Sequence, residues 1–252
     1  MKLSEQERAE HRASFALMTI PEKLEYIFAY YKFPLVLIAI ALIALGSVVY
    51  KKVTHKDALL YVACANVSMG TTLDEALNEG FVRASGLTTR RNEVYLYRGL
   101  YLSQDASTEN HEYAYASNLK VLAAITNRQM DVALMNREAY DLLSASGYLL
   151  PLDEMLANDA TLKQRVEGKL TENSVIIEDN AIEYHLSEAD AYHATTETVT
   201  NAIRISDFPL FEQAGFSGEV YLGVIGNTAR SDEVMKYIDY LTHPQTTGRE
   251  QE

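Results

Sequence analysis

The sequence predicts an α/β domain that is preceded by a single transmembrane helix, and three observations support this fold class. Residues 33–50 contain no charged side chain. Residues 58–146 alternate between short apolar runs and amphipathic segments, in the order strand, helix, strand, helix, strand, helix. Hydrophobic residues make up 48% of the 252 residues and charged residues 23%, which is the composition of a folded chain.

The uncharged run FPLVLIAIALIALGSVVY lies between Lys32 and Lys51. Its 18 residues would extend about 27 Å as a helix, close to the thickness of a bilayer's hydrocarbon layer. A buried core helix would normally carry a polar stripe, and a cleaved signal peptide has a shorter leader and a shorter apolar core. We therefore predict an uncleaved transmembrane helix at 33–50, preceded by a juxtamembrane helical arm at 1–32.

Residues 57–252 form the predicted α/β domain, and its first part alternates regularly. Apolar runs predict strands and helical spacing of apolar residues predicts helices. The strands are expected at 58–66, 93–102 and 131–135, and the helices at 71–85, 112–128 and 137–146. Such alternation predicts right-handed crossovers and a mainly parallel sheet.

The second part of this domain has a less regular pattern. Short helices are expected at 153–156 and 161–168, strands at 174–177, 181–185 and 220–225, a Thr-rich strand pair at 193–205, and an amphipathic helix at 231–242. No internal repeat and no low-complexity linker separates these segments.

The charge of the chain excludes some classes of partner. Residues 57–252 hold 30 acidic and 14 basic residues, and the whole chain has a formal net charge of −13. Nucleic-acid binding needs a Lys/Arg surface that neutralises phosphate, and anionic lipid attracts the same surface. The single cysteine excludes a disulfide framework and a structural zinc site built on several cysteines.

Catalytic motifs are absent from the sequence. It contains no nucleophile elbow, no P-loop and no dinucleotide-binding fingerprint. His185, Glu188 and His193 form the one local group with a spacing that suggests a metal site, and solvated surface residues are the simpler interpretation. We therefore predict no enzymatic activity, no catalytic residue, no metal site and no cofactor.

The 17 tyrosines leave two interpretations open. Tyr95, Tyr97 and Tyr101 alternate along the strand expected at 93–102 and share one face of it. They would either stack against a ligand or cover the sheet as cross-strand neighbours, and covering the sheet is the commoner role.

Two segments are similar to a known family. Residues 120–135 (KVLAAITNRQMDVALM) and 142–156 (LLSASGYLLPLDEML) resemble the extracellular solute-binding proteins of ABC importers. In that family a helix ends in a polar turn before an Asp-Val strand, and another helix leads to a Gly-x-Leu-x-Pro-Leu-Asp segment. Residues 231–243 resemble the family's late helix, and the anchor with its arm resembles membrane-tethered proteins of Gram-positive gut bacteria. Family members are usually larger.

The resemblance implies a two-lobed, periplasmic-binding-protein-like domain of type 2 that captures a small ligand by hinge closure, in connection with transport. In open α/β sheets ligands bind outside the carboxyl ends of the strands. The residues expected there are Asn66, Ser68, Ser103, Gln104, Asn136 and Arg137, with Asp207 and Tyr221 approaching from the other lobe. An anionic ligand is disfavoured unless Arg98 or Arg137 lines the cleft.

The predicted setting is the membrane of a bacterial cell, with the globular domain outside and the N-terminus in the cytoplasm. Lys23 and Lys32 precede the span and Lys51, Lys52 and Lys56 follow it. The positive-inside rule therefore gives no clear orientation and slightly favours the opposite one. A second hypothesis is a non-catalytic interaction domain that has lost its ligand and docks on a membrane transporter or sensor. The expected partners are thus a small molecule or a transporter subunit, together with the bilayer at 33–50.

Overall fold

The computed structural model describes residues 19–21, 23, 32–103, 110–186 and 191–244, without the side chains of residues 32, 35, 48–54 and 183. The chain divides into two units, Met1–His55 and Lys56–Glu252. Most of the predicted helical arm at 1–32 lies outside the described residues.

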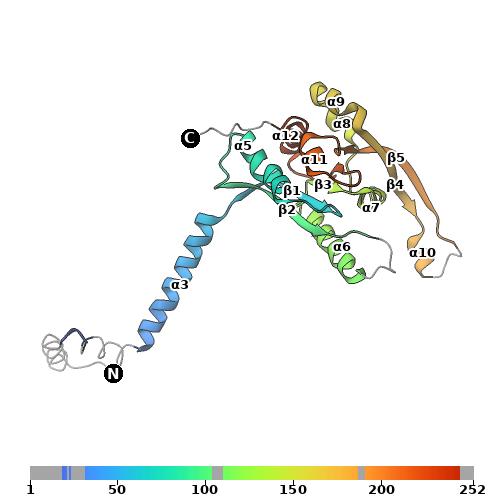
Figure 1. Ribbon diagram of the computed structural model, residues 1–252. Helices are drawn as coiled ribbons and strands as arrows, with labels where there is room; N and C mark the ends of the chain where they lie inside the picture. Colours follow the sequence, from blue (N-terminus) through green and yellow to red (C-terminus); the bar gives the residue numbers. More distant parts are fainter. Residues whose placement is uncertain (1–18, 22, 24–31, 104–109, 187–190, 245–252) are drawn as a thin grey trace. The chain divides into compact units, whose positions relative to one another are not determined.

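The first unit contains the helix α3 (Lys32–Thr54), which includes the whole uncharged run (Figure 1). Pro34 lies in its first turn, where a proline removes no intrahelical hydrogen bond. Successive apolar side chains such as Val36, Leu37 and Ile38 are all more than half exposed, so apolar surface surrounds the helix. Among the residues that the structure describes, no helix meets the combined length and apolarity needed to span a bilayer.

The second unit is built on one six-stranded mixed sheet with the strand order β2-β1-β3-β6-β5-β4. β1 is parallel to β2 and to β3, whereas β6 is antiparallel to β3 and β5, and β5 is antiparallel to β4. The strands are β1 (Asp57–Ala65), β2 (Asn92–Leu100), β3 (Val132–Met135), β4 (Leu170–Asp179), β5 (Ala194–Arg204) and β6 (Tyr221–Val224). The α/β class is therefore confirmed, and the expectation of a mainly parallel sheet is wrong.

The antiparallel half arises because the chain changes its mode of connection after β3. Up to β3, helices carry the chain back to the start of the next strand, as a parallel sheet requires. β4 and β5 instead form a hairpin, and β6 follows after one short helix to pair between β3 and β5. The predicted strand pair at 193–205 is the single strand β5, which pairs with β4 on one side and with β6 on the other.

The helices of the second unit agree closely with the amphipathic segments of the sequence. They are α4 (Thr71–Glu75), the π-helical turn η1 (Ala76–Gly80), α5 (Phe81–Ala84), α6 (His111–Thr126), α7 (Arg137–Ala145), α8 (Leu152–Ala157), α9 (Ala160–Val166), the 3-10 turn η2 (Glu167–Lys169), α10 (Ala181–His185), α11 (Pro209–Ala214) and α12 (Ser231–Thr242). Residues 181–185 are the helix α10 and not the strand that the sequence predicts, and α11 is not predicted from the sequence.

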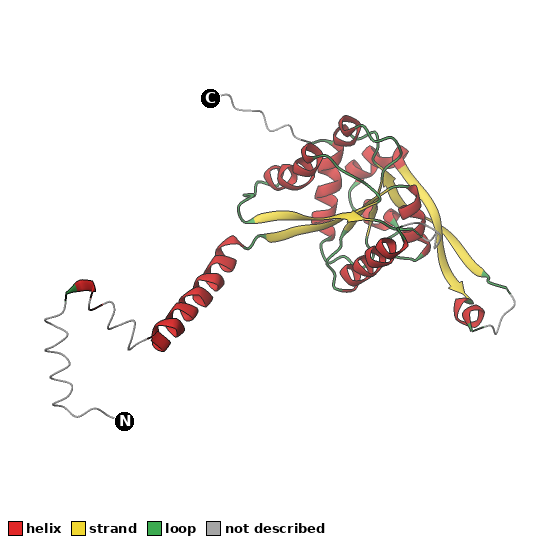
Figure 2. Cartoon of the chain, turned by 60° about the horizontal axis from the view of Figure 1, so that its bottom comes forward, coloured by secondary structure: helices red, strands yellow, loops and turns green. Residues whose placement is uncertain are grey.

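Helices cover both faces of the sheet (Figures 1 and 2). Alternation along β1 sends Leu60, Val62 and Cys64 to one face, where they pack with α4–α5, α8, α9, α11 and α12. Ala63 and Ala65 point to the other face, where they pack with α6 and α7. The small alanine side chains let these two helices approach the sheet closely.

The two-lobed arrangement implied by the family resemblance is not confirmed. Residues 56–252 belong to one compact unit, and their described strands form one sheet. The segment between β3 and β6, which would supply most of a second lobe, instead forms short helices and a hairpin of that same sheet.

Candidate functional site

The strand order creates a crevice at one edge of the sheet. The helices that follow β1 lie on one face, and α7, which follows β3, lies on the other. Neighbouring parallel strands whose connections leave in opposite directions open a crevice at their carboxyl ends, where α/β proteins commonly bind ligands. A cavity of about 530 Å³ lies at this position, at the ends of β1, β2 and β3. Its lining residues are Asn66, Val67, Ser68, Gly99, Leu100, Tyr101, Asn110, Tyr113, Asn136 and Glu138.

Asn66 braces one wall of the cavity. Its backbone has a φ of 57°, the left-handed conformation that asparagine tolerates better than most residues. Its side-chain Oδ1 accepts a hydrogen bond from the backbone N–H of Leu102 at 2.7 Å, and its Nδ2 donates to the carbonyl of Leu102 at 2.8 Å. Asn66 therefore ties the end of β1 to the end of β2 and shapes the cavity rather than offering its amide to a ligand.

Asn136 has a capping role on the opposite wall. Its Oδ1 accepts a hydrogen bond from the backbone N–H of Ala139 at 2.9 Å, which caps α7. Its Nδ2 has no hydrogen-bond partner among the described residues, so this donor remains for a ligand. The exposed Ser68 adds a hydroxyl group to the same cavity.

Two stacked tyrosines form an aromatic wall. The rings of Tyr101 and Tyr113 lie 6.5 Å apart with an interplanar angle of 18°. The hydroxyl of Tyr113 donates to the carbonyl of Gly99, and the backbone N–H of Tyr101 donates to Ser117 Oγ at 3.1 Å. Gly99 has a φ of 67°, and a Cβ atom there would lie 3.1 Å from the Tyr113 hydroxyl. A glycine is thus required for this contact.

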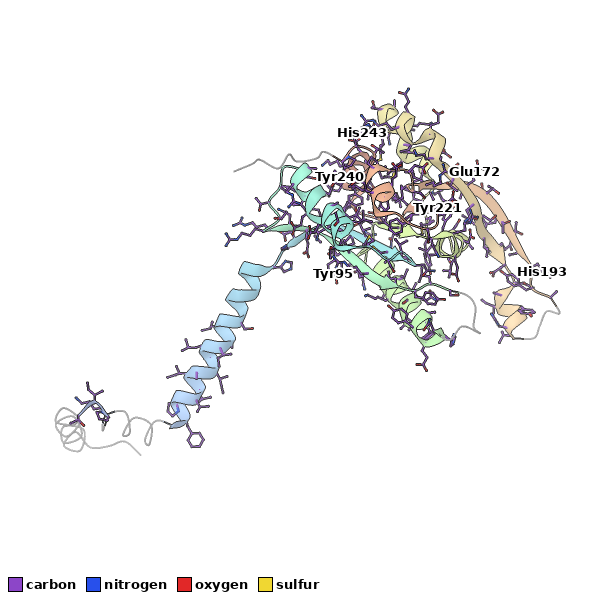
Figure 3. All side chains as sticks on the ribbon, in the orientation of Figure 1. Tyr95, Glu172, His193, Tyr221, Tyr240 and His243 are labelled. Atoms are coloured by element: carbon purple, nitrogen blue, oxygen red, sulfur yellow. The ribbon has the colours of Figure 1, made fainter. Side chains whose placement is uncertain are left out.

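Arg137 and Tyr221 meet beside the cavity, although they do not line it. The guanidinium carbon of Arg137 lies 5.4 Å from the ring centre of Tyr140 and 5.9 Å from that of Tyr221. Tyr221 pairs with Met135 at the end of β3, which places its ring near the first turn of α7 (Figure 3). Burial raises the pKa of Tyr221, and its hydrogen bond to Glu219 adds to this. The expectation that these two residues lie on opposite lobes is not confirmed, because Tyr221 begins β6 and Arg137 begins α7, directly after the neighbouring strand β3.

Two further predicted residues, Asp207 and Ser103, do not line the cavity. Asp207 forms ion pairs with Lys169 at 3.1 Å and Arg204 at 3.2 Å, and the Lys169 ammonium lowers the pKa of Asp207. Ser103 is buried after β2 and does not line the cavity. Gln104 lies outside the described residues.

Sequence analysis missed three residues whose polar or aromatic side chains line the cavity: Asn110, Tyr113 and Glu138. Each stands at or within the first turn of a helix that follows a strand, and this position is the signal that would have found them. Among the described residues, no group of three or more His, Cys, Asp or Glu side chains is arranged to hold a metal ion. The cavity therefore offers hydrogen bonds, one carboxylate and aromatic stacking.

Another hollow, of about 220 Å³, lies between α5 and α12 and includes Tyr240 and His243, which are labelled in Figure 3. It is the smaller of the two and lies away from the carboxyl ends of the strands.

In comparisons with protein-family models, with curated proteins and with solved structures, no match to this chain is found.

Proposed function

We propose that this protein binds a small polar ligand in the cavity at the carboxyl ends of β1, β2 and β3. The observation that carries the proposal is the position of this 530 Å³ cavity at the crevice between oppositely directed connections. The volume is within the range of small-molecule sites, which combine apolar surface with a few placed polar groups. Hinge closure between two lobes is not part of this proposal.

The charges around the cavity favour a neutral or cationic ligand. Glu138 contributes a carboxylate to the lining. The two arginines that would attract an anion are engaged elsewhere, since Arg98 pairs with Asp74 and Arg137 pairs with Asp141. The Asn136 amide and the Ser68 hydroxyl would fix the orientation of the ligand, and the ring of Tyr101 or Tyr113 would stack on it.

We further propose that α3 anchors the protein in a bacterial membrane with residues 56–252 outside the cell. The uncharged run of the sequence, residues 33–50, is longer than the part whose side chains the structure describes. Its described apolar side chains are exposed all round the helix, which is unfavourable in water and favourable in lipid. Both proposals are compatible with a role in solute uptake.

A thermal-shift screen of the full chain in detergent tests ligand binding. Neutral, cationic and anionic small molecules are compared, and a true ligand at about 100 times its Kd should raise Tm by roughly 5–10 °C. Ser68→Phe places a ring in the cavity at an exposed position, and Ser217→Phe is the matched control on an exposed loop. We expect at least a tenfold loss of affinity for Ser68→Phe alone. A flat screen, or equal binding by both variants, would reject the proposal.

The second candidate function is an interaction domain that docks on a membrane protein. One observation favours it: the β4–β5 hairpin carries exposed apolar side chains at its far end. This surface is separate from the cavity.

A further inference from the structure

The β4–β5 hairpin extends beyond the rest of the sheet, with α10 at its far end (Figures 1 and 2). Near the sheet, residues 201–203 of β5 are buried, and the last of them pairs with β6. From Ala194 to Thr198, by contrast, every β5 side chain is exposed. The far half of the hairpin therefore has no core of its own.

The base of the hairpin is joined to α7 by a hydrogen-bond network of buried side chains. The hydroxyl of Tyr140 donates to Asn201 Oδ1 at 2.7 Å, and Asn201 Nδ2 donates to Ser144 Oγ at 2.8 Å. The Ser144 hydroxyl donates in turn to the carbonyl of Ser174 at 3.0 Å. Through these bonds α7 is joined to both strands at the base of the hairpin.

The hairpin tip, defined as residues 177–186 and 191–194, is also ordered by its own contacts. Asn180 Nδ2 donates to the carbonyl of Ala191 at 2.9 Å, and the backbone N–H of His193 donates to Asn180 Oδ1 at 2.8 Å (Figure 3). The hydroxyl of Tyr192 donates to the carboxylate of Asp179 at 3.2 Å. The two sides of the tip are thus connected by specific hydrogen bonds.

Large apolar side chains of this tip face solvent. They are Ile177, Ile182, Tyr184, Leu186 and Tyr192, and their exposed fractions lie between 45% and 73%. Two-stranded hairpins without a covered face are only marginally stable in water, and clustered exposed apolar surface commonly marks an interaction site. An apolar partner surface would cover the exposed side chains and would also stabilise the hairpin.

The charged side chains that the structure describes on the hairpin between Leu170 and Ile203 are all acidic, namely Glu172, Glu178, Asp179 and Glu197. From Leu170 to Ile203 the sequence contains seven acidic residues and no Lys or Arg. A partner with an acidic surface, or an anionic lipid headgroup, would be repelled here. A second copy of the chain would bring like charges together across a symmetric contact.

We propose that the hairpin tip docks on another protein, whose contact surface is an apolar patch bordered by Lys and Arg. Ile182 and Leu186 insert into the patch, and Glu178 and Glu197 face its basic rim. The surface is independent of the cavity, so the two proposals stand or fall separately.

Site-specific photocrosslinking of the full chain in its native membrane tests this docking. A benzophenone amino acid replaces Tyr184 on the tip, and in a control it replaces the exposed Tyr115 on α6. We expect an adduct from position 184 only, and the crosslinked segment of the partner should combine apolar residues with Lys or Arg. Ser68→Phe should leave the adduct unchanged.

Matched variants then test the chemistry of the contact. Ile182→Ser with Leu186→Ser should lower the adduct yield at least ~10-fold, as loss of interface anchors does. Leu119→Ser with Leu122→Ser on α6 should leave it unchanged, and all four positions are exposed, so the Tm should hold. Glu178→Lys with Glu197→Lys should also lower the yield. Adducts with a second copy, with lipid or with an acidic segment would overturn the proposal, as would equal yields from positions 184 and 115.

Discussion

At the scale of single residues, the most constrained polar group is the buried carboxylate of Asp131. It has no exposed surface, and it accepts hydrogen bonds from the backbone N–H of Tyr61 at 2.9 Å and from Thr228 Oγ1 at 2.6 Å. The guanidinium of Arg230 lies 3.3 Å away and supplies the compensating charge. This one side chain therefore joins β1, the start of β3 and the loop before α12.

Replacing Asp131 should be strongly destabilising. Asp131→Ala removes the acceptor of the Tyr61 N–H and of the Thr228 hydroxyl and the ion pair with the partly exposed Arg230, and we expect the free energy of unfolding to fall by about 2–4 kcal/mol. Glu79→Ala removes only an exposed ion pair with Arg83 and should cost less than about 1 kcal/mol. Urea unfolding of both variants measures the difference, and equal losses would contradict the role given to Asp131.

Cys64 predicts a pH dependence of stability. Burial raises its pKa from 9.0 to about 12 because the thiolate is disfavoured in the apolar interior. The unfolded thiol ionises at lower pH, so the folded state binds more protons and its stability falls as the pH rises from about 9 towards 12. At pH 10 we expect this group to contribute a loss of about 1.4 kcal/mol. Urea midpoints at pH 8, 9 and 10 should therefore fall less steeply for Cys64→Ala, and identical slopes would contradict the assignment.

At the scale of elements, the helix between β1 and β2 shows how a local irregularity is stabilised. The turn η1 widens to π-helical geometry, and the hydroxyls of Tyr240 and Tyr237 donate to the carbonyls of Ala76 and Leu77 at 2.9 and 3.3 Å. Gly80 makes room for this contact, since a Cβ atom there would lie 2.4 Å from the Tyr240 hydroxyl. The two tyrosines of α12 therefore bind the carbonyls of the irregular turn, and Gly80 leaves the space that this contact needs.

Two glycine-to-alanine substitutions should differ in their effect on the free energy of unfolding. Gly80→Ala displaces the Tyr240 hydroxyl and should lower the free energy of unfolding by about 1–3 kcal/mol, the usual cost of overpacking. Gly168→Ala has no atom within 4 Å of the new Cβ and should be neutral or slightly stabilising. Thermal unfolding of both variants is the measurement. A stable Gly80→Ala variant would show that α12 shifts without cost.

How far the sequence predicts the fold and the cavity also depends on the element. Strong periodicity placed α12 at Ser231–Thr242, the bounds that the structure shows. The tip sequence AIEYH lacks such a pattern, and contacts of Asn180 with residues 191 and 193 decide its helical form.

Asn66, Ser68 and Asn136 were found because they follow strands, and Tyr113 was missed because its position depends on how α6 packs against β2. Asp207 was misplaced because the sequence gives no information on its ion pairs with Lys169 and Arg204.

At the scale of the whole molecule, the two units differ in how much of their apolar surface is exposed. Residues 56–252 bury their apolar side chains on both faces of one sheet, whereas α3 exposes its own. This contrast supports the proposal that α3 lies in lipid. It gives the anchor proposal a direct test.

Removing or charging α3 should release the protein from membranes. We expect the full chain to remain in the membrane fraction after alkaline carbonate extraction, and a chain that begins at Lys56 to appear in the supernatant. Ile40→Lys with Ile43→Lys should also prevent insertion, because each charge at the middle of a bilayer costs about 2.5–3.5 kcal/mol. Ile20→Lys, outside the uncharged run, is the control. Release of the full chain by carbonate would contradict the proposal.

The position of β6 has a consequence for biosynthesis. β6 is the last of the described strands, yet it lies between β3 and β5 and joins the parallel half of the sheet to the hairpin. While the ribosome is still making residues 205–220, the two halves have no strand to connect them, and the edges of β3 and β5 stay unpaired. Complete folding therefore waits until residues 221–224 leave the exit tunnel, and a premature stop before Tyr221 would yield a product for chaperones and proteases to remove.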